Sequence, residues 1–115
     1  MRRRLLIGVG ALMAMGAAAV TYEVLPSTRA RSWNERGIAL AEAGHHEEAV
    51  RAFAVAADLN PGYSAVHYNM GRSYLALLHT DQAATCFRRA LDEDPGNVEA
   101  SRMLTLTSYA LRRYR

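Results

Sequence analysis

Beyond residue 30, apolar residues recur every three or four positions, the spacing that places them on one face of an α-helix. The pattern predicts helices over residues 32–43, from about residue 47 to 59, from 63 to 78, from about 81 to 93 and from 98 to 115. Gly44 can end the first in a left-handed cap, and Thr80 or Asp81 is expected to cap the fourth. Asn60-Pro61-Gly62 and Asp94-Pro95-Gly96 separate the others, because proline disfavours helix in the residue before it. The fold class is therefore all-α.

Residues 30–97 are one unit written twice, with a period of 34 residues. The shift aligns identical residues at Gly37/Gly71, His45/His79, Ala49/Ala83, Phe53/Phe87, Ala56/Ala90, Asp58/Asp92, Pro61/Pro95 and Gly62/Gly96. A fixed period of this size is typical of helical repeat proteins. Gly37 and Gly71 fall in mid-helix, where glycine costs about 1 kcal/mol relative to alanine, so we expect close helix approach there. Ala49 and Ala83 are the expected facing partners, with Phe53 and Phe87 beyond them.

With these residues in view, the chain resembles the tetratricopeptide repeat family. The first copy carries Trp33, Gly37, Leu40, Ala49, Phe53 and Pro61; the second carries Met70, Gly71, Tyr74, Ala83, Phe87 and Pro95. Three positions depart from the family pattern. Arg36 stands where the family has leucine, Leu40 where it has tyrosine, and His67 where it has tryptophan. The resemblance implies antiparallel helix pairs in a right-handed superhelix with a concave, peptide-binding face. It divides the chain into repeats at 30–63 and 64–97 and a terminal capping helix at 98–115.

The resemblance also implies which residues line the binding face. Mapped by register, they are Asn34, Ile38, Ala41, Tyr68, Asn69, Arg72, Leu75, Arg102, Leu106 and Tyr109. We expect Tyr68, Arg72 and Tyr109 to form the centre of a peptide site with an acidic-aromatic preference, since tyrosine and arginine often dominate binding energy. The alternative is that Tyr68 and Tyr109 only pack on each other and cover the interior. Of the family's clamp for a C-terminal carboxylate only Asn69 matches, because Asn34, Ile38, Glu99 and Met103 occupy its other places.

The N-terminal segment, residues 1–25, begins with three arginines followed by an uncharged run from Leu5 to Tyr22, long enough to cross a bilayer as a single helix. It is interpreted as an uncleaved signal anchor; a signal peptide cleaved after the 17–19 alanines and an organelle transit peptide are the alternatives. The arginines place Met1 in the cytoplasm and the repeats in the periplasm. Gly10, Ala14 and Ala18 recur at a spacing that lets membrane helices pack closely. Residues 26–29 form the predicted linker, where Ser27 or Thr28 can cap the next helix.

Charge and chemistry remove several function classes. All 14 basic residues are arginine, which suggests a GC-rich, bacterial source. The net charge of +3 comes from the two ends, and the mildly acidic repeats give no reason to expect nucleic-acid binding. His45 and His79 share a turn position but bring no recurring carboxylate or thiol, so no metal, cofactor or catalytic site is expected. Cys86 is expected to be a half-buried, inert thiol.

Two functions fit these observations. In the first, the protein is a membrane-anchored adaptor or scaffold that presents a helical groove to a peptide or protein partner. In the second, it is a small structural or assembly subunit of a larger membrane complex, held through its anchor and one repeat face. The sequence does not name the partner in either case.

Overall fold

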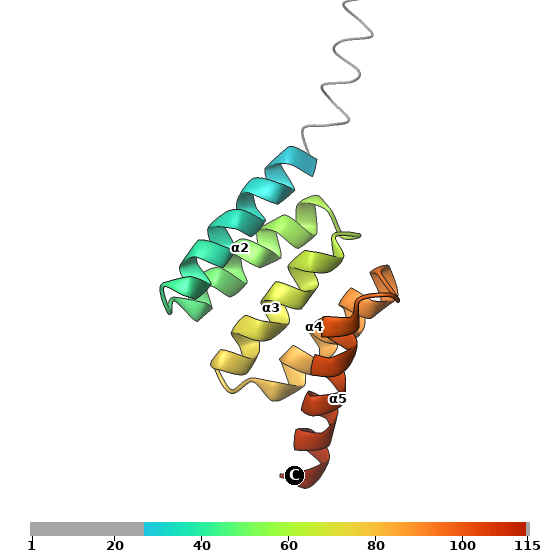
Figure 1. Ribbon diagram of the computed structural model, residues 1–115. Helices are drawn as coiled ribbons and strands as arrows, with labels where there is room; N and C mark the ends of the chain where they lie inside the picture. The colour runs from blue at the N-terminus through green and yellow to red at the C-terminus, as the bar shows by residue number, and fades with distance from the viewer. Residues whose placement is uncertain (1–26, 115) are drawn as a thin grey trace, which may run out of the picture.

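The computed structural model describes residues 27–114 and contains five helices and no strand within that range (Figure 1). The helices are residues 27–42, α2 His46–Leu59, α3 Ser64–Ala76, α4 Thr80–Glu93 and α5 Val98–Arg113. The all-α prediction and the number of helices in the repeat region are therefore confirmed. The expected membrane segment, with Gly10, Ala14 and Ala18, lies outside the described residues. No helix that the structure does describe is long and apolar enough to cross a membrane.

Turn chemistry explains most of the helix ends. Gly44 has a φ of 86°, and the N–H groups of Gly44 and His45 donate back to carbonyl oxygens at the end of the first helix, as expected for a left-handed cap. Asn60 and Asp94 are the C-caps of α2 and α4, each directly before a proline. These three predicted boundaries are confirmed.

Two predicted helix starts are wrong. The chain is helical from residue 27, so Ser27 and Thr28 lie within the first helix. His79 is the N-cap of α4 and makes no side-chain capping hydrogen bond, whereas Thr80 and Asp81 lie in the first turn. The reason is the preceding turn, in which Leu78 has a φ of 62° and thereby sets where the next helix begins.

Each helix pair closes over a glycine. A Cβ atom at Gly37 would lie 2.5 Å from the Phe53 ring, and one at Gly71 would lie 2.7 Å from the Phe87 ring. The predicted close approach is confirmed, but the nearest partners are the phenylalanine rings and not Ala49 and Ala83. Each phenylalanine ring occupies the space that a side chain at the glycine would need, because glycine has no Cβ.

The helix pairs stack into one body, in which α3 packs against both α2 and α4, and α4 packs against α5. A hydrogen bond joins the two repeats directly, because Asn69 Nδ2 donates to Asn34 Oδ1 at 3.1 Å. Within the second repeat, Ser64 Oγ donates to Ala90 O at 2.9 Å and ties α3 to α4. His67, in the family's tryptophan place, is buried, and its Nε2 lies 2.9 Å from the Pro61 carbonyl oxygen. A carbonyl can only accept, so this ring nitrogen carries the proton.

The last helix follows its predicted stripe only in part. Ala100 is fully buried, whereas Tyr114, predicted on the same apolar face, is 81% exposed. Thr107 is buried instead, and its hydroxyl donates to the Met103 carbonyl oxygen at 2.8 Å. This local bond satisfies the hydroxyl, so a threonine can occupy a buried position that hydrophobicity would not assign to it.

Candidate functional site

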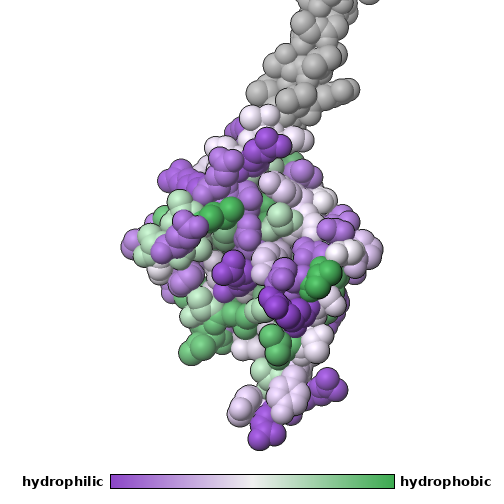
Figure 2. Space-filling view, in the orientation of Figure 1, coloured by the Kyte–Doolittle hydropathy of each residue, from purple (hydrophilic) through white to green (hydrophobic). Residues whose placement is uncertain are grey.

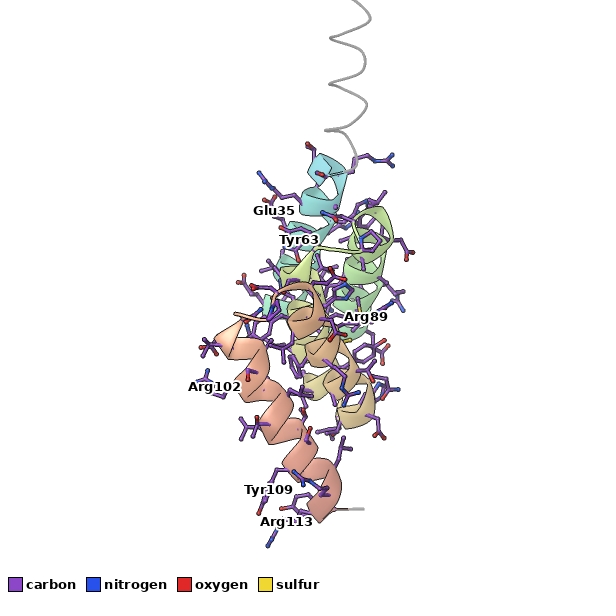
Figure 3. All side chains as sticks on the ribbon, turned by 90° about the vertical axis from the view of Figure 1, so that its right-hand side faces the viewer. Glu35, Tyr63, Arg89, Arg102, Tyr109 and Arg113 are labelled. Carbon is purple, nitrogen blue, oxygen red and sulfur yellow. The ribbon has the colours of Figure 1, made fainter. Side chains whose placement is uncertain are left out.

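The first helix, α3 and α5 lie on one side of the molecule, toward the viewer in Figure 1, with α2 and α4 behind them. We call this side the front face. Figure 3 shows it in profile on the left, where Glu35 of the first helix and Arg102 and Tyr109 of α5 project outward. The face is therefore built from the first helix of each repeat, as the resemblance implied. Its surface alternates polar and apolar residues (Figure 2).

The front face is hollowed between the first helix and α3, with α2 behind. The hollow has a volume of about 440 Å³. It is lined by Ile38, Ala41, Glu42, His46, Phe53, Asn69, Arg72, Ser73 and Ala76. We call it the front hollow. Its walls combine aliphatic carbon with one acidic and one basic side chain, so it can hold an amphipathic group with either sign of charge at one end.

A stacked group of side chains extends from the front hollow toward α4. The Arg72 guanidinium lies over the Tyr68 ring, 5.9 Å from its centroid, and the Tyr68 ring lies 5.8 Å from that of Phe87, with an interplanar angle of 50°. The cation–π contact orients an exposed arginine beside the hollow. Because the Tyr68 ring packs on Phe87 in the core of the second repeat, the position of Tyr68 depends on the packing of that repeat.

Polar groups beneath the hollow are only partly satisfied. Asn34 is 6% exposed and accepts the hydrogen bond from Asn69, which fixes the orientation of the Asn69 amide. Ser73 Oγ and His46 Nδ1 are buried and have no hydrogen-bond partner. Ser73 and His46 both line the front hollow, so a polar group that enters the hollow can bond to them.

The predicted binding residues divide into two groups. Ile38, Ala41, Asn69 and Arg72 line the front hollow, and Tyr68 contacts it through Arg72. Asn34 does not line the hollow but is bonded to its lining residue Asn69, and Leu75 is half-buried on α3. The α5 residues Arg102, Leu106 and Tyr109 do not line the hollow either. Arg102 forms an ion pair with Glu99 on its own helix. Leu106 and Tyr109 are 56% and 57% exposed.

Register alone missed Glu42, His46, Phe53, Ser73 and Ala76 in the lining. Glu42 and Ala76 each follow a predicted residue by one or more helical turns, a signal that could have found them. Phe53 and His46 belong to α2, and only the packing of three helices brings them to this side. Within the described residues no ring contact links Tyr68 to Tyr109, so the alternative in which these two side chains only cover each other is not what the structure shows.

The described residues include no cluster of three or more histidine, cysteine, aspartate or glutamate side chains that could hold a metal ion. Cys86 is 8% exposed, and burial raises the pKa of its thiol to about 11, while the nearby Arg89 acts in the opposite direction. The thiolate is the reactive form of cysteine, so this thiol is poorly suited to nucleophilic chemistry at neutral pH.

Sequence comparison identifies known proteins to which this chain is similar. Two family models, each described as tetratricopeptide repeat, match residues 40–105 and 12–64. The human protein named tetratricopeptide repeat protein 6 is 35% identical over 71 residues, which are 62% of this chain and 14% of that protein. The chain therefore spans about 14% of the length of this relative.

Solved structures share the fold at low sequence identity. The second tetratricopeptide domain of Spaghetti (RPAP3), bound to the HSP90 peptide SRMEEVD, is 17% identical with a TM-score of 0.73, and the match covers 76% of this chain and 81% of that one. The first such domain of human RPAP3 is 20% identical with a TM-score of 0.50, covering 76% of this chain and 95% of that one. These matches concern the helical architecture.

Proposed function

Because the chain belongs to the tetratricopeptide repeat family, we propose that it is an interaction module that binds a peptide segment of a protein partner across the front face. The observation that carries the proposal is the front hollow with Arg72 held over Tyr68 at its edge. An exposed arginine stacked on a tyrosine combines a charged donor with a large apolar surface. Such residues are the ones that most often dominate binding at protein interfaces.

The chemistry of the hollow suggests the ligand. Arg72 offers a guanidinium to a carboxylate, and Ile38, Ala41 and Ala76 offer an apolar wall below it. Leu106 and Tyr109 add exposed apolar surface farther along the front face. We therefore infer a segment with an acidic residue near an aromatic or aliphatic one.

The peptide held by the Spaghetti (RPAP3) domain is a useful comparison. Only Asn69 matches the family's carboxylate clamp here, and its amide already donates to Asn34. We infer that a C-terminal carboxylate is not the main recognition element. A synthetic SRMEEVD peptide is therefore expected to bind more weakly than an internal acidic-aromatic segment of the true partner, in a fluorescence anisotropy titration of both.

The test begins with the full-length protein captured in mild detergent and its co-purifying partners identified by mass spectrometry. With a partner in hand, Tyr68→Ala and Arg72→Ala should each weaken binding by about 1–3 kcal/mol. Arg88→Ala is the matched control, because Arg88 is exposed and belongs to α4. The helix α4 lies behind the helices of the front face (Figure 1). Circular dichroism must show that Tyr68→Ala stays helical, since this ring packs on Phe87.

The result that contradicts the proposal is clear. If Tyr68→Ala and Arg72→Ala both bind the partner as the parent does, the front face is not the site. The interaction would then belong to the α2/α4 side or to the N-terminal segment.

We further propose that residues 5–22 hold the module at a membrane with the repeats on the periplasmic side. The support is the uncharged run and the arginines before it.

A further inference from the structure

Among the described residues, Leu78 is unusual in both its exposure and its backbone conformation. It is 86% exposed, and its backbone has a φ of 62°. The left-handed region is unfavourable for residues other than glycine, because Cβ crowds the following carbonyl oxygen. The equivalent turn of the first repeat has Gly44 there, with a φ of 86°. The second repeat therefore holds a large apolar side chain in water, in a conformation that the first repeat gives to glycine.

A second hollow lies next to this leucine, between the α3–α4 turn and the end of α5. Its volume is about 420 Å³. It is lined by Leu78, His79, Thr80, Asp81, Gln82, Ala110, Leu111 and Tyr114. We call it the end hollow. Tyr114 on its rim is 81% exposed, and Figure 2 shows hydrophobic side chains gathered at the lower left, where α3 ends. None of its lining residues belongs to the front hollow.

We propose that this end of the molecule is a self-complementary docking surface for a second copy of the chain, in which Leu78 of each copy enters the end hollow of the other. A two-fold contact uses the same patch on both copies, so the patch must contain both the projecting group and its receptor. Leu78 is the projecting group, and Ala110, Leu111 and Tyr114 supply an apolar receptor. Both lie at one end of the molecule, beside each other.

The charges of the patch fit the same partner. The first turn of α4 is acidic through Asp81, and the last turn of α5 is basic through Arg112 and Arg113. Asp81 lines the end hollow from α4, and Arg112 and Arg113 follow its lining residue Leu111 on α5. A two-fold contact that brings the α4 start of one copy toward the α5 end of the other would therefore pair opposite charges. A strongly single-signed patch would instead repel its own copy.

The inference is independent of the proposed function, because it uses no residue of the front hollow. It also leaves the front face of each copy open, since the end hollow lies at the turn after α3 and at the end of α5 (Figure 1). A dimer of this kind would present two front faces to one or two partners. Any gain in affinity would then come from bivalent engagement.

The first experiment is sedimentation velocity of the full-length protein in mild detergent over a range of concentrations. The parent should show a reversible monomer–dimer equilibrium. Leu78→Gly, which copies the residue of the first repeat, should raise the dissociation constant at least about tenfold, and Tyr114→Ser should act in the same direction. Leu106→Ser is the matched control, since Leu106 is an exposed leucine of α5 outside the end hollow.

Leu78→Gly also keeps the test independent of folding, because relief of the backbone conformation should leave the monomer at least as stable as the parent. A monomeric parent up to about 1 mM would overturn the proposal. The proposal would also be overturned if Leu78→Gly and Tyr114→Ser both dimerised with the dissociation constant of the parent. Association would then run through another segment, such as residues 5–22.

A second experiment locates the contact. Two variants with one added cysteine each, Leu78→Cys and Tyr114→Cys, should form a disulfide between copies when mixed under mild oxidation. Leu78→Cys mixed with Glu35→Cys on the front face should not. Cys86 does not compete, because it is buried. Equal cross-linking in both mixtures would contradict the predicted contact.

Discussion

The mid-helix glycines show how one missing Cβ decides the packing of each repeat. Gly37 and Gly71 let a phenylalanine ring lie against helix backbone, at a separation that no real Cβ could share. Their role could be predicted, because both copies accept the same conformational cost at the same place. The identity of the neighbour could not, since periodicity assigns a residue to a face but does not say how far a ring reaches across to the next helix.

Gly71→Leu should destabilise the protein. The new side chain must displace the Phe87 ring, and overpacking costs about 1–3 kcal/mol, which outweighs the roughly 1 kcal/mol gained in helix propensity. Urea denaturation followed by circular dichroism measures the change. Gly62→Ala is the control, because the nearest atom to its new Cβ is Glu93 Oε2 at 3.5 Å, an ordinary contact. Equal stability of Gly71→Leu and the parent would contradict the close approach.

At the scale of elements, the starts of helices are the features that sequence reasoning placed least well. Three helices end at Gly44, Asn60 and Asp94, and these ends follow directly from the chemistry of glycine and proline. The start of α4 does not, because a leucine in left-handed conformation makes the turn and no side chain caps the helix. Propensity favours Thr80 or Asp81 as the cap, but the turn geometry of the repeat decides the register.

The α5 N-cap gives a direct measure of capping in this fold. The Asn97 side chain accepts a hydrogen bond from the Ala100 N–H at 3.0 Å, whereas His45 at the start of α2 makes no such bond. Asn97→Ala should therefore cost about 1 kcal/mol. His45→Ala should change stability by less than about 0.5 kcal/mol, since its contact with Glu48 is exposed and long. Equal losses in the two variants, compared by urea denaturation, would argue against a special role for the asparagine cap.

The candidate site illustrates the same limit between elements. Ile38, Asn69 and Arg72 could be assigned to the hollow from the register of the first helices alone. Phe53 and His46 could not, because they reach the front only where α2 packs behind two other helices. The α5 residues were assigned to the same site by register, but α5 packs on α4 and its exposed side chains form a separate part of the face.

At the scale of the whole molecule, stability depends on contacts between neighbouring repeats, since each helix pair buries its face only against the next. The hydrogen bond between Asn34 and Asn69 is such a contact, and Asn34 is buried. A double-mutant cycle with alanine at both positions should give a coupling energy of about 0.5–1.5 kcal/mol. The cycle of Asn34 with Thr105 should be additive, because Thr105 bonds within its own helix. Additivity of the two asparagines would show that the repeats do not communicate through this bond.

The N-terminal segment decides where the molecule works. The uncharged run from Leu5 to Tyr22 follows three arginines. These arginines favour an N-terminus that stays in the cytoplasm and repeats that are exported across the membrane. We therefore expect the full-length protein, expressed in bacteria, to remain in the membrane fraction after carbonate extraction, because a spanning helix is not released by loss of electrostatic contacts. Intact-mass spectrometry should find residues 1–25 retained, and Leu12→Arg, which puts a charge in mid-run, should shift the protein out of the pellet. A mature chain beginning near Val20 would establish cleavage instead, and the repeats would then act without a membrane tether.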